Sequence, residues 1–151
     1  MSETKTLGVG DVAPDFTLKN ENNQDVKLSG LRGKPVVLFF YSLDFSPFCT
    51  TEACAYRDDT SLFEGKGAQI FGISRDSTWT HKAFKEKEGL TYSLLADLKG
   101  VVATLYGCWN EAIGIAERLT VVIDKDGTIT YVEHNGPGQI RDQKKALAAI
   151  S

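Results

Sequence analysis

The chain has 151 residues, of which 42% are hydrophobic and 25% are charged, the proportions of an ordinary globular protein. Its net charge of −3 gives no electrostatic reason to expect nucleic acid or a membrane surface as a partner, and no apolar run approaches the roughly 20 residues of a membrane span. The short polar start lacks the apolar core of a signal peptide, so we expect one domain over residues 1–151 in the cytoplasm, where structural disulfides are rare.

The first half of the chain predicts a hairpin, a buried strand and a helix. Residues 10–28 carry short apolar clusters around polar turns, a pattern typical of a small N-terminal hairpin. Residues 35–41 are apolar at consecutive positions, as expected for a strand that is covered on both faces. A helical pattern follows over residues 50–64, so the buried strand leads directly into a helix.

The rest of the chain continues this alternation. Lys-Asp-Gly at residues 125–127 is a strong turn signal between two apolar strands. The predicted elements are strands over residues 69–74, 92–95, 119–124 and 128–133, and helices over residues 80–88, 100–106 and 139–150. This order predicts an α/β fold in which helices flank a mixed central sheet, and it matches the thioredoxin-like fold.

Cys49 lies at the junction between the buried strand and the helix that follows it. Ser46 is expected to be the N-cap of that helix and Pro47 its first residue, which puts Cys49 in the first turn. Backbone amides and the helix dipole at this position favour a thiolate over a thiol. A cysteine placed in this way is usually a nucleophile, although cysteine is also among the most often buried residue types.

The stretch around Cys49 resembles the peroxidatic signature of the peroxiredoxins, Pro-x-x-x-Thr/Ser-x-x-Cys, with Ser46 as its serine. Residues 49–58, Cys-Thr-Thr-Glu-Ala-Cys-Ala-Tyr-Arg-Asp, are similar to the bacterioferritin-comigratory, or peroxiredoxin Q, branch. Further stretches that resemble the family are residues 10–16, 72–77 and 118–124. The resemblance therefore covers nearly the whole chain.

This resemblance implies a thiol peroxidase that reduces hydrogen peroxide and organic hydroperoxides through a sulfenic acid on Cys49. It implies that Arg118 keeps the thiolate ionised and holds the peroxide, that Ser46 hydrogen-bonds the peroxide, and that Glu52 orients the arginine. Plainer interpretations remain for each of them. Ser46 can be only a helix cap, Glu52 only a favourable charge in the first turn, and Arg118 only a surface residue in an ion pair.

Cys54 is the candidate resolving thiol. Five residues along an α-helix put two Cα atoms roughly 8–9 Å apart, beyond the limit of about 7 Å for a disulfide without backbone movement. A bond between Cys49 and Cys54 therefore requires the first turns of the helix to unwind. Cys108 is an alternative partner, although a small buried apolar position is its simpler interpretation.

The sequence departs from the family pattern at Ser42, where the signature has a proline that is thought to shield the active cysteine. Serine loses the fixed φ of proline and offers a hydroxyl instead. A second function therefore stays open, a redox-sensing or partner-binding module on the same scaffold with slow turnover. The fold alone does not choose between the two.

The resemblance also implies recycling by thioredoxin or a similar dithiol, and the branch contains both monomers and homodimers. The sequence has no glycine-rich phosphate loop or dinucleotide fingerprint, so no cofactor is expected. Its cysteines lack the short paired spacing of a zinc site, so no metal is expected. His81 is expected to be structural or solvated rather than catalytic.

Overall fold

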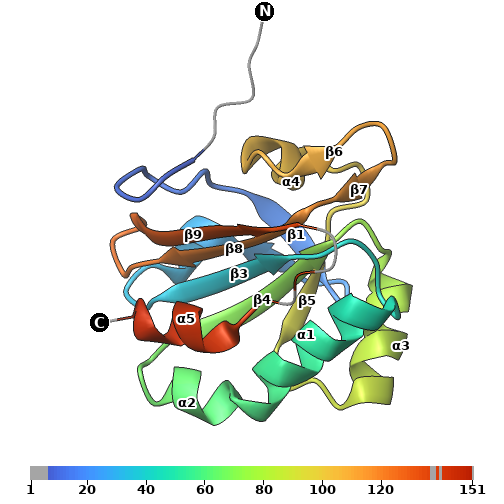
Figure 1. Cartoon of the computed structure of the whole chain (residues 1–151), viewed down its shortest axis with the longest axis horizontal. Coiled ribbons are helices and arrows are strands. Elements are labelled where there is room, and N and C mark those ends of the chain that lie inside the picture. Colours follow the sequence, from blue (N-terminus) through green and yellow to red (C-terminus); the bar gives the residue numbers. More distant parts are fainter. Residues whose placement is uncertain (1–6, 137–138, 140, 151) are drawn as a thin grey trace, which may run out of the picture.

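The computed structural model describes residues 7–136, 139 and 141–150 of the chain. A seven-stranded sheet forms its centre, with helices on both faces (Figure 1). The strands of this sheet are β1 (Thr17–Asn20), β2 (Asp25–Lys27), β3 (Val36–Phe40), β4 (Gln69–Ser74), β5 (Ser93–Ala96), β8 (Arg118–Ile123) and β9 (Ile129–Asn135). The helices are the 3-10 helix η1 (Leu28–Leu31) and the α-helices α1 (Pro47–Asp58), α2 (Thr60–Glu64), α3 (Thr78–Glu88), α4 (Val101–Leu105) and α5 (Gln143–Ala148). A small second sheet pairs β6 (Trp109–Asn110) with β7 (Ile115–Ala116).

The main sheet is mixed, and its strand order is β2-β1-β5-β4-β3-β8-β9. β3, β4 and β5 run parallel, because a helical connection separates each strand from the next. β8 is antiparallel to β3 and forms a hairpin with β9. The predicted N-terminal hairpin is confirmed as β1 and β2, which join the sheet through β5. This is the thioredoxin-like arrangement that the order of elements predicts.

β3 lies between two hydrophobic cores, since alternate residues of a strand point to opposite faces. Val36, Leu38 and Phe40 pack on the face that α4 and the β6–β7 hairpin cover. Val37 and Phe39 pack on the opposite face, beneath α1, α2, α3 and α5 (Figure 1). Every residue of β3 is therefore buried, which explains the consecutive apolar residues in this part of the sequence.

Two predicted helices differ from the structure by more than the one or two residues seen at the ends of α3 and α4. The helix predicted over residues 50–64 begins at Pro47, the residue expected to open it, but it is broken at Asp59, whose φ of −102° and ψ of 9° are not helical. The last helix was predicted from residue 139 but begins at Gln143. Its start is fixed by Asp142, whose side chain accepts the backbone N–H of Lys144 at 2.9 Å. Residue 140 of that prediction lies outside the described residues.

The β6–β7 hairpin is missing from the predicted elements. Trp109 pairs with Ala116 and Asn110 with Ile115, so each strand has only two residues and leaves no alternating pattern in the sequence. The hairpin packs against the start of α4 through Trp109 and Gly100. A Cβ atom at Gly100 would lie 2.4 Å from the indole ring, and the φ of 69° at this position also favours glycine.

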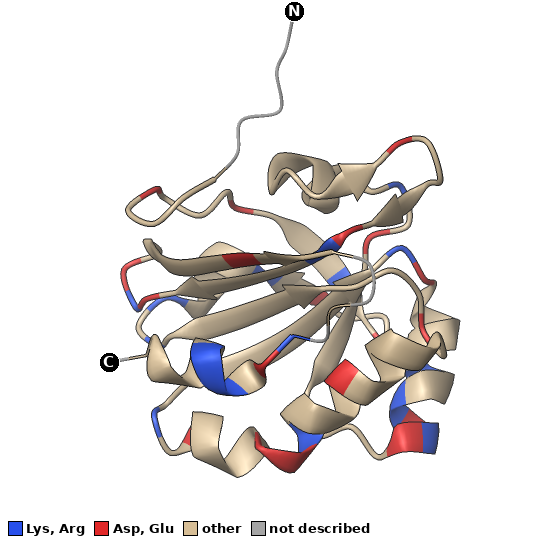
Figure 2. Ribbon diagram, in the orientation of Figure 1, with Lys and Arg blue, Asp and Glu red and all other residues tan. Residues whose placement is uncertain are grey.

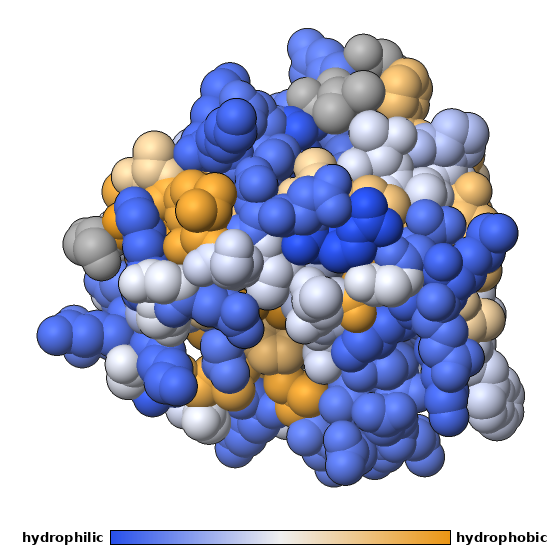
Figure 3. Space-filling model, turned by 90° about the horizontal axis from the view of Figure 1, so that it is seen from below, coloured by the Kyte–Doolittle hydropathy of each residue, from blue (hydrophilic) through white to orange (hydrophobic). Residues whose placement is uncertain are grey.

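Charged residues lie mainly in the helices and in the turns, while the central strands carry few (Figure 2). The face seen from below in Figure 3 is largely hydrophilic, with its apolar residues in small separate patches. In the part of the chain that the structure describes, no helix has the length and apolarity to cross a bilayer.

Candidate active site

The start of α1 is built as the sequence predicts, with one difference. Ser46 occupies the N-cap position in an extended conformation, Pro47 opens the helix, and Cys49 lies in the first turn. The Ser46 hydroxyl does not accept a bond from a helix amide but donates one to the carbonyl oxygen of Leu43 at 2.7 Å. The expected position of Ser46 is therefore confirmed, and its expected side-chain cap is wrong.

Cys49 lies in the first turn of α1 and is buried, with only 2% of the residue exposed. Its Sγ lies 3.2 Å from the hydroxyl oxygen of Ser42, in the loop that follows β3. Ser42 and Arg118 both line a cleft of about 320 Å³. The β6–β7 hairpin and its turn supply the apolar wall of this cleft, which contains Ile113, Ile115 and Ala116.

Arg118 is the first residue of β8 and is 9% exposed. Its Nη1 donates to Glu52 Oε2 at 2.8 Å, and its Nη2 donates to the carbonyl oxygen of Gly136. The guanidinium carbon lies 5.7 Å from the ring centroid of Phe48, the residue before Cys49. The structure therefore brings Arg118 and Glu52 together beside the first turn of α1.

Sequence reasoning missed a second buried arginine, Arg141, which also binds Glu52. Its backbone N–H donates to Glu52 Oε2 at 2.8 Å, and its Nε lies 3.0 Å from Glu52 Oε1, an ion pair that is not aligned as a hydrogen bond. Its guanidinium also donates to oxygen atoms of Leu119, Thr120 and Phe40. Glu52 is 1% exposed, so its carboxylate is held between two arginines away from water. Arg141 belongs to no motif, and only the fold places it here.

Cys54 lies further along α1 and points toward α3. Its thiol donates to Glu88 Oε1 at 3.4 Å. Burial raises the pKa of Cys54 above its ordinary value, and the hydrogen bond to Glu88 raises it further, against the opposing charge of Arg57. In this conformation Cys54 is therefore held as a thiol, in contact with α3.

Cys108 lies in the other core, on the opposite face of the sheet from Cys49. It is completely buried, and burial raises the pKa of its thiol well above the ordinary value. Its position agrees with the interpretation of Cys108 as a small apolar residue of the core. A direct bond between Cys108 and Cys49 would have to cross the sheet.

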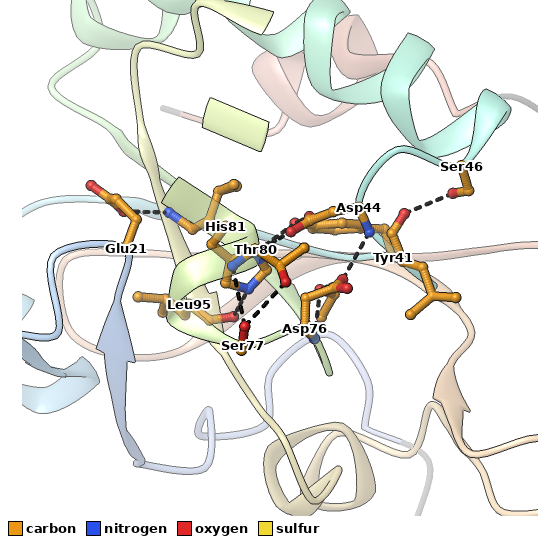
Figure 4. A network of polar contacts seen from close by, with 12 residues as sticks. Glu21, Tyr41, Asp44, Ser46, Asp76, Ser77, Thr80, His81 and Leu95 are labelled. Carbon is orange, nitrogen blue, oxygen red and sulfur yellow. Dashed lines mark hydrogen bonds and ion pairs between the residues drawn. The ribbon is translucent and has the colours of Figure 1, made fainter. Parts of the chain in front are cut away.

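A buried polar network anchors the loop between β3 and α1 (Figure 4). The hydroxyl of Tyr41 donates to Asp44 Oδ1, and Asp44 Oδ2 lies 2.7 Å from His81 Nδ1. The other ring nitrogen, Nε2, lies 3.0 Å from the carbonyl oxygen of Leu95, and the backbone N–H of Asp44 donates to Asp76 Oδ2 at 2.8 Å. Burial raises the pKa of Tyr41 well above its ordinary value, and the charge of Asp44 adds to the effect.

His81 is completely buried, which agrees with the structural role expected from the sequence. A carbonyl oxygen only accepts, so Nε2 donates to Leu95 and carries a proton. Polar atoms of Asp44, Asp76 and His81 lie within 4.8 Å of one another. Because these atoms already bond protein groups, we interpret the cluster as an internal network that ties the start of α1 to α3, β4 and β5.

Comparison with known proteins gives a consistent result. Residues 9–132 match the model of the AhpC/TSA family. The chain is 42% identical over 151 residues to the protein named alkyl hydroperoxide reductase E of Mycobacterium tuberculosis, an alignment that covers 96% of this chain and 99% of the relative. It is also 42% identical over 127 residues to chloroplastic peroxiredoxin Q of Triticum aestivum, covering 83% of this chain and 58% of that protein.

Solved structures agree with the sequence comparisons. Peroxidoxin BcpB from Mycobacterium tuberculosis superposes with a TM-score of 0.87 and 35% sequence identity, over 94% of this chain and 95% of that one. AhpC of Enterococcus faecalis also gives a TM-score of 0.87, at 27% identity, over 94% of this chain and 89% of that one. The expected thioredoxin-like fold and the resemblance noted in the sequence are both confirmed.

Proposed function

The chain belongs to the AhpC/TSA family and is a peroxiredoxin, a peroxidase that acts on hydroperoxides, and from that premise we propose that Cys49 is its nucleophile. The observation that carries this proposal is the place of Cys49. It lies in the first turn of α1, in hydrogen-bond contact with Ser42, which shares a cleft with Arg118. Both the helix dipole and a nearby donor favour the thiolate that attack on a peroxide requires.

In the proposed first step, the Cys49 thiolate attacks the terminal oxygen of the hydroperoxide. An S–O bond forms and the O–O bond breaks, so that sulfur is oxidised to a sulfenic acid and the peroxide is reduced. The leaving alkoxide or hydroxide takes up a proton to give an alcohol or water. Negative charge therefore moves from the sulfur to the leaving oxygen, and donors aimed at that oxygen lower the barrier.

Arg118 is the proposed donor to the peroxide and to its leaving oxygen. Glu52 orients it, because the carboxylate fixes Nη1 from the buried side while Arg141 holds the carboxylate in turn. Ser46 has a different proposed role. Its proton is directed at Leu43, so its oxygen remains free to accept a hydrogen bond from the O–H of the hydroperoxide.

The cleft supports organic hydroperoxides as substrates in addition to hydrogen peroxide. Its apolar wall, formed by Ile113, Ile115 and Ala116, offers an alkyl group a surface away from water. Hydrogen peroxide needs only the polar end, near Ser42 and Arg118. We therefore propose that both substrate classes react at the same sulfur.

Cys54 is the proposed resolving thiol. Its sulfur attacks the sulfenic sulfur of Cys49, an S–S bond forms, and the oxygen leaves as water after taking up a proton. The position of Cys108 on the opposite face of the sheet favours Cys54 in this role. The step requires the first turns of α1 to unwind, since both cysteines belong to this helix.

Thioredoxin or a similar dithiol is the proposed reductant, which returns the disulfide to two thiols by exchange. We propose further that the protein works in the cytoplasm as a monomer or homodimer. An interaction with thioredoxin is tested by coupling peroxide consumption to thioredoxin and its reductase. Absence of turnover with thioredoxin, with turnover restored by a chemical dithiol, would exclude thioredoxin and leave the peroxidase step intact.

Stopped-flow fluorescence of the reduced protein mixed with hydrogen peroxide tests the main proposal. Oxidation should be far faster than that of free cysteine at the same pH, and Cys49→Ser should abolish it. Replacing Arg118 by Met should lower the rate constant by about 10²–10³-fold, the usual effect of removing one transition-state donor, and Ser46→Ala should lower it less. A wild-type rate constant near that of free cysteine would end the proposal.

Peptide mapping by mass spectrometry tests the resolving step separately. The protein oxidised with one equivalent of peroxide should give a bridge between Cys49 and Cys54, and Cys54→Ser should accumulate sulfenic acid. If Cys49 stays unbridged in the wild-type protein, the intramolecular resolving step is lost while the peroxidase step remains.

A further inference from the structure

We propose that the Ser42 hydroxyl is a further group in contact with the reacting sulfur, and that it donates a hydrogen bond to the Cys49 thiolate before attack. The two atoms lie 3.2 Å apart, within hydrogen-bond distance for a sulfur acceptor. The inference rests on the proposed role of Cys49. It adds a donor to the sulfur, whereas Arg118 is proposed to act on the peroxide.

The direction of this hydrogen bond follows from the charge state. A thiolate has no proton and can only accept, so the hydroxyl of Ser42 must be the donor when Cys49 is ionised. Within the part of the chain that the structure describes, this hydroxyl bonds no other protein group. Its proton is therefore available to the sulfur.

The backbone around Ser42 holds the hydroxyl in place. The preceding residue, Tyr41, donates its backbone N–H to Ile73 at 3.0 Å and its hydroxyl to Asp44, so both sides of Ser42 are tied to buried groups. Ser42 is itself half-buried and lines the cleft. The hydroxyl is therefore in contact with the sulfur and belongs to a residue that lines the cleft.

A donor to the sulfur has two opposite effects on the reaction. It favours the thiolate, so the reactive form persists to lower pH. It also withdraws charge from the nucleophile, and the reactivity of a thiolate falls with its basicity, with a Brønsted coefficient of about 0.4–0.5 in thiol–disulfide exchange. Ser42 therefore extends the pH range of the enzyme at the expense of its maximal rate constant, an effect that proline at this position cannot have.

The test compares Ser42→Ala and Ser42→Pro, which remove the hydroxyl, with Ser42→Thr, which keeps it. Ser61→Ala is the matched control, because Ser61 is an exposed residue of α2. Two quantities are measured across pH, the rate of alkylation of Cys49 by iodoacetamide in a Cys54→Ser, Cys108→Ser background, and the rate constant with hydrogen peroxide. Far-ultraviolet circular dichroism verifies that each variant is folded.

In the Ala and Pro variants the midpoint of the alkylation profile should move to higher pH by about one unit, the size expected for one charge-assisted hydrogen bond. The limiting rate constant at high pH should rise about threefold, as the Brønsted coefficient requires. Ser42→Thr, which keeps the hydroxyl, should keep the midpoint of the parent protein, and Ser61→Ala should match the parent protein in both measurements.

A midpoint that stays in place in Ser42→Ala, or one that moves equally in Ser42→Thr, overturns the inference. A lower limiting rate constant in Ser42→Ala also overturns it, because mere loss of local structure slows the reaction. Failure of the proposed function is distinguishable from these outcomes. It would appear in the parent protein as a rate constant near that of free cysteine, whatever residue stands at position 42.

Discussion

The thiol of Cys54 donates a hydrogen bond to the carboxylate of Glu88 at 3.4 Å, which joins α1 to the last residue of α3. This contact and the burial around it raise the pKa of Cys54. A thiol is a much weaker nucleophile than a thiolate. The helical form of α1 therefore keeps the candidate resolving cysteine unreactive, while the candidate nucleophile, Cys49, lies in the first turn of the same helix in contact with Ser42.

Replacing Glu88 by Gln should speed formation of the Cys49–Cys54 disulfide severalfold at neutral pH. The substitution removes the negative charge that raises the pKa of Cys54 and also weakens the contact that holds α1 against α3. Rapid acid quench followed by mass spectrometry of the peptides measures the step. Glu86→Gln removes the same charge from an exposed position of α3 and should leave the rate unchanged. Equal acceleration in both variants would point to general charge effects instead.

Replacing Glu52 by Gln should lower the free energy of unfolding by about 3–5 kcal/mol, because it leaves two buried guanidinium groups without their carboxylate. Urea unfolding of the reduced protein measures the loss. Glu133→Gln is the control, since Glu133 pairs with Lys145 at the surface at 3.4 Å and its loss should cost less than about 1 kcal/mol. Similar losses in the two variants would contradict the structural importance of Glu52.

Two buried tyrosines should respond differently to loss of the hydroxyl. Tyr41→Phe removes a donor from the buried carboxylate of Asp44 and should cost about 1–3 kcal/mol of stability. The hydroxyl of Tyr56 is buried without a hydrogen-bond partner among the described residues, so Tyr56→Phe should be neutral or stabilising. Urea unfolding of both variants distinguishes them, and equal changes would show that the Tyr41–Asp44 bond adds no net stability.

Glu21 should make folding stability depend on acid pH. Burial alone would raise its pKa, but the backbone N–H groups of Glu21 and Leu94 and the ammonium of Lys85 outweigh burial and hold the pKa below the ordinary 4.5. A carboxyl whose folded pKa is lowered adds stability above its unfolded pKa. That stability is lost as the pH falls below about 4.5 and through the lower folded value.

Glu21→Gln should therefore flatten the slope of unfolding free energy against pH in this acid range. Urea unfolding at a series of pH values measures the slope. Glu64→Gln, at an exposed position of α2, should keep the wild-type slope. An unchanged slope in Glu21→Gln would mean that the Glu21 carboxyl binds protons equally in the folded and unfolded states of the wild-type protein.

Cys108→Ala should leave both the peroxide reaction and the yield of the Cys49–Cys54 bridge unchanged. The sheet separates Cys108 from Cys49, and its thiol belongs to the core beneath α4. Stability should fall by about 1 kcal/mol, as for an ordinary small core substitution. A lower yield of the bridge in this variant would return Cys108 to the redox cycle.

The sequence predicts an element most accurately where burial requires a recognisable pattern of apolar residues. β4 has the predicted bounds, Gln69–Ser74, because five of its six residues are buried and leave a continuous apolar run. The end of α3 is equally well marked, since Gly89 takes the left-handed conformation expected of a helix C-cap. The break at Asp59 leaves no such signal, and the helical pattern passes through it.

The candidate site is only partly readable from the sequence, for a different reason. Cys49, Ser46, Glu52 and Arg118 were found through a local signature and a family resemblance. The contact of Arg141 with Glu52 joins residues 89 positions apart, and nothing in the local sequence indicates it. The resemblance showed that Ser42 differs from the family, but only the fold reveals that its hydroxyl reaches the sulfur.

The main sheet separates two layers of the molecule. One layer contains α1, the other contains α4 and the β6–β7 hairpin, and the central strand β3 is buried on both faces. A rearrangement confined to the beginning of α1 leaves the core beyond the sheet in place. Such partial opening requires far less free energy than complete denaturation. In the proposed resolving step, the beginning of α1 therefore unwinds while the sheet and the core beyond it serve as the template on which this segment re-forms.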